Sequence, residues 1–176
     1  MTIWLERALF VTAPQDSGKS TQLRSMFVDH RFGGNGVVPT SRNIAETYHI
    51  SNDRRLHLRL TSPHEYGETP REFIDKLKSK MGAGRWCFAG AFQPDAFNKM
   101  PDIVETVRRF IAAFEPERVR VVFLSPNRHG IELASFLSGR DLSAELLQIP
   151  SVEVACVDAR QRQSNGLFLA DFFDFT

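Results

Sequence analysis

Short apolar runs alternate along the chain with segments in which apolar residues recur at helical spacing. The runs of strand length lie at residues 9–12, 45–50, 56–60, 85–92, 119–124 and 152–157. Helical spacing predicts helices at residues 20–27, 70–81, 102–114, 131–137 and 167–175. Strands that alternate with helices are typical of an α/β fold with a largely parallel sheet, and we expect such a fold here.

The second and third predicted strands differ from the others because no helix separates them. Residues 51–55 join them, and the Asn52-Asp53 pair in this connection is good turn chemistry. The sequence therefore predicts an antiparallel hairpin within an otherwise parallel arrangement.

Length and composition are those of one soluble domain. The chain has 176 residues and no break in composition, so we expect residues 1–176 to form a single domain. No apolar stretch approaches the roughly 20 residues of a membrane span, and the first residues have no basic segment that leads an apolar one. The sequence predicts a cytoplasmic protein with no membrane span.

The net charge and the two cysteines indicate which partners and which cellular compartment to expect. The 22 Lys and Arg residues are balanced by 21 Asp and Glu residues, so the net charge predicts no nucleic-acid partner. Cys87 and Cys156 are far apart, and each lies in an apolar run. This pattern favours buried thiols in a reducing compartment over a disulfide or a metal site.

Residues 13–20 carry the clearest chemistry. They read Ala-Pro-Gln-Asp-Ser-Gly-Lys-Ser between the first predicted strand and the first predicted helix, which is the pattern of a phosphate-binding loop. Gly18 lets the backbone approach a nucleotide, Lys19 reaches its β- and γ-phosphates, and the Ser20 hydroxyl ligates Mg²⁺. The nucleotide-binding residues predicted in this segment are Ala13, Asp16, Ser17, Gly18, Lys19, Ser20 and Thr21.

Ala13 departs from the loop pattern, which usually has Gly at that position. The exchange is tolerable where the residue keeps a negative φ. The alternative interpretation is a chance turn before a helix, with Ser20 or Thr21 as incidental polar residues.

The order of these elements around the loop resembles that of the Ras-like small GTPases, over essentially the whole chain, and most of all their bacterial gliding-motility branch. The resemblance implies a three-layer α/β/α domain with a six-stranded, mostly parallel sheet in the order 2-3-1-4-5-6. It also implies Mg²⁺ and GTP, GDP or another purine nucleotide as ligands.

In that family a threonine of the first switch loop reaches Mg²⁺ and the γ-phosphate. Pro39-Thr40 lies at a matching distance from the phosphate loop, so the resemblance makes Thr40 the candidate metal ligand and switch residue. The alternative is an ordinary turn residue. The two switch loops, residues 31–44 and 60–70, are the surfaces through which such a protein would bind a protein partner.

The second switch loop departs from the family pattern. Thr61 replaces an aspartate that holds Mg²⁺ through water, His64 replaces a glycine, and Glu65 replaces the glutamine that orients the attacking water. Glu65 is therefore the candidate catalytic residue together with Thr40. The replacements predict slow or absent hydrolysis.

The base-reading motif is also altered. Asn127 and Arg128 match its first two positions, but Gly130 occupies the place of the aspartate that selects guanine. After the sixth strand, Asp158 is a further candidate near the base or ribose. The sequence predicts weak guanine preference or none.

Three functions fit these observations. The first is a divergent small GTPase-like switch, and the second is a non-hydrolysing adaptor of the same fold that binds proteins. The third is a P-loop kinase of small molecules, which the predicted antiparallel hairpin disfavours.

Overall fold

The computed structural model describes residues 2–32, 35–133 and 140–175. Its strands are β1 (Ile3–Thr12), β2 (Thr47–His49), β3 (Arg54–Arg59), β4 (Gly84–Phe92), β5 (Arg118–Leu124) and β6 (Val152–Val157). Its α-helices are α1 (Lys19–Ser25), α2 (Pro70–Met81), α3 (Ile103–Phe114), α4 (Leu142–Leu147) and α5 (Arg162–Asp171). Two short 3₁₀ turns, η1 (Met26–Val28) and η2 (His30–Phe32), follow α1.

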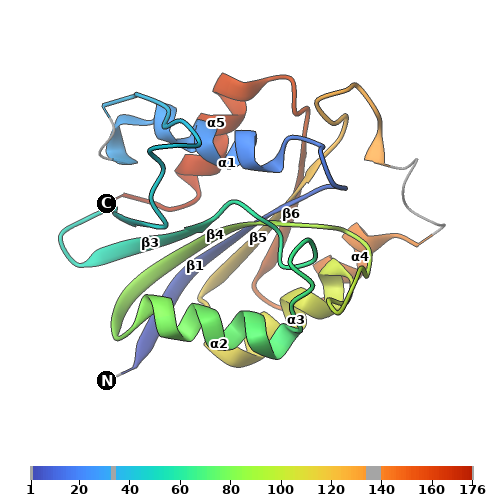
Figure 1. Cartoon of the computed structure of the whole chain (residues 1–176), viewed down its shortest axis with the longest axis horizontal. Helices are drawn as coiled ribbons and strands as arrows, with labels where there is room; N and C mark the ends of the chain where they lie inside the picture. Colours follow the sequence, from blue (N-terminus) through green and yellow to red (C-terminus); the bar gives the residue numbers. More distant parts are fainter. Residues whose placement is uncertain (1, 33–34, 134–139, 176) are drawn as a thin grey trace.

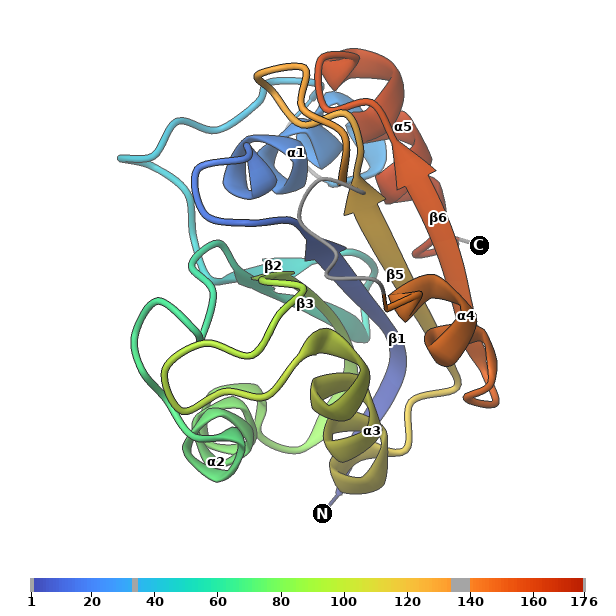
Figure 2. The same ribbon diagram turned by 90° about the vertical axis from the view of Figure 1, so that its right-hand side faces the viewer.

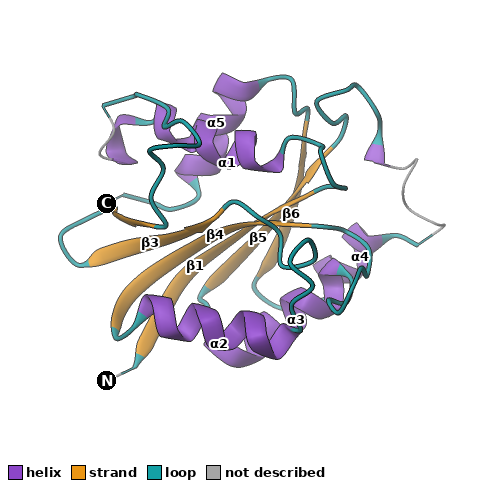
Figure 3. Ribbon diagram, in the orientation of Figure 1, coloured by secondary structure: helices purple, strands orange, loops and turns teal. Residues whose placement is uncertain are grey.

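The strands form one six-stranded sheet that lies between two layers of helices (Figure 1). Helices α1 and α5 cover one face, and α2, α3 and α4 cover the other (Figure 3). All strand pairs are parallel except β2 with β3. The predicted three-layer α/β/α class and the predicted antiparallel hairpin are therefore confirmed.

The strand order needs one correction. The observed order is β2-β3-β4-β1-β5-β6, so β4 lies between β3 and β1, whereas the Ras-like order 2-3-1-4-5-6 places β3 next to β1. Every residue from Trp86 to Phe92 of β4 is buried, as a strand with helices on both faces requires. The apolar run in the sequence predicts that this strand is buried, but it does not predict which strands lie beside it in the sheet. In the observed order, β4 is the direct neighbour of β1, the strand that leads into the predicted phosphate loop.

Side chains of the sheet alternate between two apolar cores. In β1, Phe10 faces α2 and α3, whereas Leu9 and Val11 face α1 and α5. In β4, Phe88 shares the core with Phe10, and their ring centroids lie 5.7 Å apart. The alternation is regular in β4 and from Ala8 onward in β1, whereas a register shift between Leu5 and Arg7 places Leu5 in the same core as Phe10.

Several element boundaries differ from expectation. The strand predicted at residues 45–50 is confined to β2, which lies at the sheet edge, and the predicted final helix begins five residues earlier than expected, at Arg162. The helix predicted at residues 131–137 lies largely outside the described residues. Cys87 is buried as predicted, but Cys156 is exposed because β6 is the other edge strand.

Helices α1 and α5 pack closely on their shared face of the sheet. A Cβ on Gly166 would lie 2.1 Å from the carbonyl oxygen of Ser25, so only glycine allows this approach. Nearby, Gln22 donates a hydrogen bond from Nε2 to the carbonyl oxygen of Ala159 at 2.6 Å and accepts one from Asn165 at 3.0 Å. These contacts fix α1 against the segment that follows β6.

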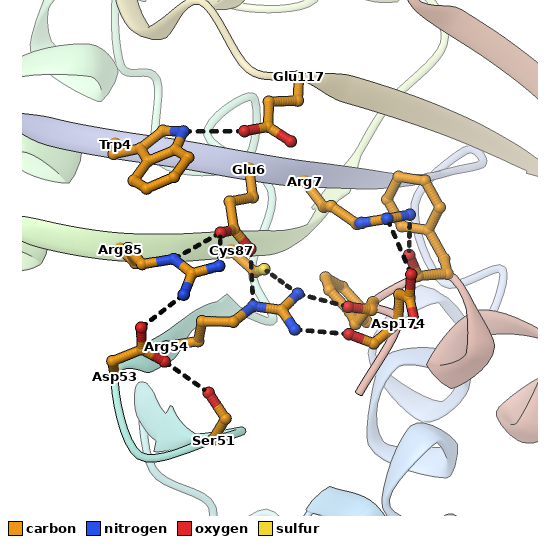
Figure 4. Close-up of polar contacts among 12 residues, drawn as sticks. Trp4, Glu6, Arg7, Ser51, Asp53, Arg54, Arg85, Cys87, Glu117 and Asp174 are labelled. Atoms are coloured by element: carbon orange, nitrogen blue, oxygen red, sulfur yellow. Dashed lines mark hydrogen bonds and ion pairs between the residues drawn. The ribbon is translucent and has the colours of Figure 1, made fainter. Parts of the chain in front are cut away.

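A polar cluster anchors the C-terminal segment at the opposite end of the sheet (Figure 4). The buried Arg54 forms an ion pair with Glu6 at 2.6 Å and donates hydrogen bonds to the carbonyl oxygens of Phe173 and Asp174, both at 2.5 Å. Arg7 donates to the carbonyl oxygen of Phe172 at 2.9 Å. The arginines thereby satisfy carbonyl groups that the end of α5 leaves without helical partners.

Candidate phosphate-binding site

The predicted phosphate loop runs from the carboxyl end of β1 into α1. Ala13 donates a backbone hydrogen bond to Phe92 at 3.2 Å, so the loop starts beside the end of β4. Gly18 precedes α1 with φ 98° and ψ 15°, in the left-handed region that favours glycine. Ala13 lies outside that region, so the condition for an alanine at this position is met.

The side chain of Lys19 stabilises the curved backbone of the loop through hydrogen bonds. Its side chain is buried, and Nζ donates hydrogen bonds to the carbonyl oxygens of Ala13 at 3.0 Å and Pro14 at 2.7 Å. Burial lowers the pKa of Lys19 to about 8, although the nearby carboxylates of Glu65 and Asp16 oppose this shift. The side chain is therefore mainly protonated at pH 7, and two of its three donors are used within the loop.

A pocket of about 190 Å³ opens in front of Lys19. It is lined by Asp16, Ser17, Gly18, Lys19, Ser20, Leu60, Thr61, Glu65 and Arg128. A whole ligand usually occupies a pocket of about 300 Å³ or more, so this one has the size for a phosphate chain and not for a complete nucleotide.

The segment after β3 closes one side of this pocket. Thr61 and Glu65 line it, and Glu65 Oε1 lies 3.9 Å from Lys19 Nζ. His64 between them is buried, with Nε2 2.9 Å from the carbonyl oxygen of Pro101 and Nδ1 3.0 Å from the hydroxyl of Ser62. Burial lowers the pKa of His64, and the charge of Lys19 lowers it further. His64 thus ties this segment to the connection after β4.

Arg128 lies over the phosphate loop from the β5 side. Its Cβ would be 3.4 Å from a Cβ placed on Gly18, and its backbone N–H donates to Ser17 at 3.3 Å. Asn127 beside it is buried, and its Oδ1 accepts hydrogen bonds from the backbone N–H groups of His129 at 2.8 Å and Ile131 at 3.1 Å. The two residues predicted to read the base therefore have different places. Arg128 lines the pocket, and Asn127 stabilises the turn that carries Arg128.

Asp158 does not line the phosphate pocket. Its carboxylate accepts hydrogen bonds from Arg160, whose side chain lowers the pKa of Asp158 to about 2. Ala159 donates a backbone hydrogen bond to Pro126 at 2.9 Å, so the segments after β5 and β6 are joined. Asp158 therefore pairs with Arg160 in a segment that is joined to the one after β5.

Thr40 is not assembled with Ser20. It is exposed, and its backbone N–H and hydroxyl donate to Asn43 Oδ1 at 2.7 and 3.0 Å. Figure 2 shows that the residues before β2 extend outward as a loop, and Thr40 does not line the phosphate pocket. Within the ranges that the structure describes, no group of three or more His, Cys, Asp or Glu side chains could hold a metal ion. A metal at Ser20 would therefore depend on phosphate oxygens and water for its other ligands.

The sequence interpretation missed Gln93. This residue directly follows β4, is 9% exposed, and has a buried Nε2 with no hydrogen-bond partner in the described part of the chain. In β4, Ala89 and Ala91 face α1, and continued alternation puts Gln93 on that side, next to the start of the phosphate loop. No sequence motif marks Gln93; its relevance depends on the strand order.

No protein-family model matches this chain, and no curated protein or solved structure matches it. None of the helices in the described ranges is long and apolar enough to cross a membrane.

Proposed function

We propose that this chain is a nucleotide-binding switch, with the phosphates of a purine nucleoside di- or triphosphate in the loop of residues 13–20. The observation that carries the proposal is Lys19, a buried ammonium group that curls the loop and keeps a donor for a ligand. Arg128 adds a second cation at the same pocket. The pocket also has the size of a phosphate chain.

The metal in this proposal is Mg²⁺. The Ser20 hydroxyl fits it as one oxygen ligand, and Mg²⁺ commonly takes its remaining ligands from phosphates and water. When bound, Mg²⁺ would neutralise phosphate charge next to Lys19. A later approach of Thr40 would require the segment of residues 31–44 to move, as expected of a switch loop.

Slow or absent hydrolysis follows from the residues after β3. Thr61 has no negative charge with which to hold a metal-bound water, so it binds Mg²⁺ less strongly than an aspartate would. Glu65 is directed to Lys19, where a terminal phosphate would meet like charge. We propose that the arrival of a triphosphate displaces Glu65 and rearranges residues 60–70, which then bind a protein partner in the cytoplasm.

The second candidate is the adaptor that binds proteins without nucleotide. The observation in its favour is that Asp16 and Glu65 line the pocket together with Lys19 and Arg128, so the lining charges balance without a ligand. The kinase is not supported, because β2 pairs antiparallel with β3.

Calorimetric titration with GTP, GDP and ATP in the presence of Mg²⁺ tests the proposal. We expect saturable binding that Lys19→Ala weakens by about 10- to 100-fold, since a hydrogen bond from a charged group contributes about 1.5–3 kcal/mol. Lys99→Ala is the matched control, because Lys99 is exposed and outside the pocket. Absence of saturable binding, or binding that is indifferent to Lys19→Ala, would favour the adaptor.

Hydrogen exchange tests the switch itself. We expect residues 31–44 and 60–70 to show different protection with di- and triphosphate. Identical protection in the two states would refute switching and leave nucleotide binding intact.

A further inference from the structure

A second pocket, of about 370 Å³, lies beside α1 and the start of α5. Its lining residues are Thr21, Arg24, Ser25, Val28, Val38, Arg162 and Gln163. Its volume is within the range of about 300–1,000 Å³ that is usual for ligand pockets. We infer that this pocket binds the base of the nucleotide and that Arg24 and Arg162 select a base with hydrogen-bond acceptors on its exposed edge, as guanine has at O6 and N7. The inference rests on the proposed function and gives it a base preference.

The position of the pocket suits a base. Thr21 lines it and directly follows Ser20, which lines the phosphate pocket, so the two pockets adjoin at the beginning of α1. Arg24 lies three residues further along the helix, about 4.5 Å along its axis. A ligand with its phosphates at Lys19 can therefore extend along α1 into the second pocket.

The walls of the pocket combine apolar and cationic groups. Val28 and Val38 provide surface on which a planar ring can pack, and Val38 is 44% exposed. Arg24 has a buried Nε with no hydrogen-bond partner among the described residues. The side chains of Arg24 and Arg162 have no hydrogen bond or ion pair with another residue in the described ranges.

Arg24 and Arg162 both line the pocket, so their guanidinium groups can donate to the acceptors of a ligand there. A guanidinium group only donates hydrogen bonds. Guanine presents two acceptors on one edge, O6 and N7, whereas adenine presents one acceptor and an amino donor there. The amino group of adenine would face a guanidinium donor without a partner, so the pair of arginines disfavours it.

In the segment after β5, the position that reads the opposite edge of the base in the Ras-like family is altered. Gly130 has no carboxylate to accept hydrogen bonds from N1–H and N2–H, and Oδ1 of Asn127 is used by its own turn. Selection would then depend on O6 and N7 alone. Inosine keeps both of these atoms and lacks only the 2-amino group. It therefore distinguishes recognition through O6 and N7 from recognition through the 2-amino group.

The test is calorimetry of the full chain with GDP, IDP and ADP in the presence of Mg²⁺. We expect GDP and IDP to bind within about threefold of each other and more tightly than ADP by about 5- to 150-fold, the usual discrimination of a bidentate arginine contact. Arg24→Ala should bring the GDP to ADP ratio close to one, mainly by weakening GDP. Arg162→Ala should reduce the ratio independently, which guards against a folding defect in the first variant. Arg108→Ala is the matched control, since Arg108 is exposed on α3, on the other face of the sheet.

The contrary outcomes are distinct. IDP that binds much more weakly than GDP would show that the 2-amino edge is read, and equal GDP and ADP affinities would show that the arginines select no base; either result overturns the inference and leaves the phosphate site intact. A guanine preference that survives both Arg24→Ala and Arg162→Ala would also overturn it. If none of the nucleotides binds, the proposed function fails and the inference fails with it.

Discussion

Removing the charge of Glu65 should strengthen triphosphate binding. Glu65 Oε1 lies 3.9 Å from Lys19 Nζ, and the two side chains are 28% and 6% exposed. Two unit charges at this separation interact by about 1 kcal/mol in water and about 4 kcal/mol at an effective dielectric constant of about 20. A terminal phosphate must replace this contact and accept Glu65 as a neighbour of like charge. With the lower figure, Glu65→Gln should increase the affinity for a triphosphate by about fivefold.

The same substitution has an opposing effect on Lys19, and pH separates the two. The Glu65 carboxylate raises the pKa of Lys19, which burial has lowered to about 8, so Glu65→Gln should lower that pKa further. At pH 6.5 Lys19 remains protonated in both proteins, and the gain in affinity should be visible. At pH 8.5 more of the variant carries a neutral Lys19, so its advantage should shrink or disappear.

The assay is calorimetric titration of GTP and GDP with Mg²⁺ at these two pH values. The gain should be larger for GTP than for GDP, because only the triphosphate places a third phosphate next to residue 65. Glu105→Gln is the control, since it removes one carboxylate from α3, outside the phosphate pocket. If GTP binds Glu65→Gln no better than the wild-type protein at pH 6.5, Glu65 does not compete with the phosphate, and the proposed displacement of residues 60–70 is wrong.

Three further predictions concern stability. Gly166→Ala should lower the free energy of unfolding by about 3 kcal/mol or more, measured by urea denaturation, because its Cβ would lie 2.1 Å from a carbonyl oxygen of α1; a change below about 1 kcal/mol would contradict the close packing. Glu6→Ala should cost about 3–5 kcal/mol in the same assay because it leaves the buried Arg54 without its ion pair, and a neutral result would show that the pair is dispensable. Burial lowers the pKa values of His57 and His64 below 6.5, so the unfolded chain binds more protons than the folded one at acidic pH. The free energy of unfolding should therefore fall as pH drops below about 6.5, and His64→Asn should make that fall smaller; an unchanged pH profile in this variant would remove His64 from the explanation.

The parts of the structure that the sequence predicts best depend on local chemistry. The phosphate loop was predictable because Gly18 and Lys19 have fixed roles within a few residues of one another. The hairpin was predictable from the Asn52-Asp53 turn, and α2 begins as predicted at Pro70, after the capping residue Thr69. In each case the deciding interactions are between neighbours in the chain.

The parts that the sequence did not predict depend on distant contacts. The apolar run of β4 indicates a buried strand, but its place beside β1 results from pairing between residues such as Thr12 and Phe92. Gln93 was missed because its importance follows from that pairing. Cys156 was expected to be buried, and it is exposed because its strand ends the sheet.

The strand order also determines how a switch could work in this molecule. Because β4 separates β3 from β1, the segment after β3 must cross the end of β4 before Glu65 can reach the phosphate loop. Two residues anchor this segment, one on each side of Glu65 in the sequence. His64 is hydrogen-bonded to the connection after β4, and Glu68 forms an ion pair with Arg59 at 2.7 Å.

Only residues 65–67 lie between these two anchors. Gly67 there has φ 63°, in the region where glycine is unstrained, and Tyr66 is 69% exposed. In the proposed switch, a phosphate that displaces Glu65 must therefore move Tyr66, the large exposed side chain next to it. The position of an aromatic ring at the surface would then report the nucleotide state to a partner, and within residues 60–70 the largest change would fall on residues 65–67, between the two anchors.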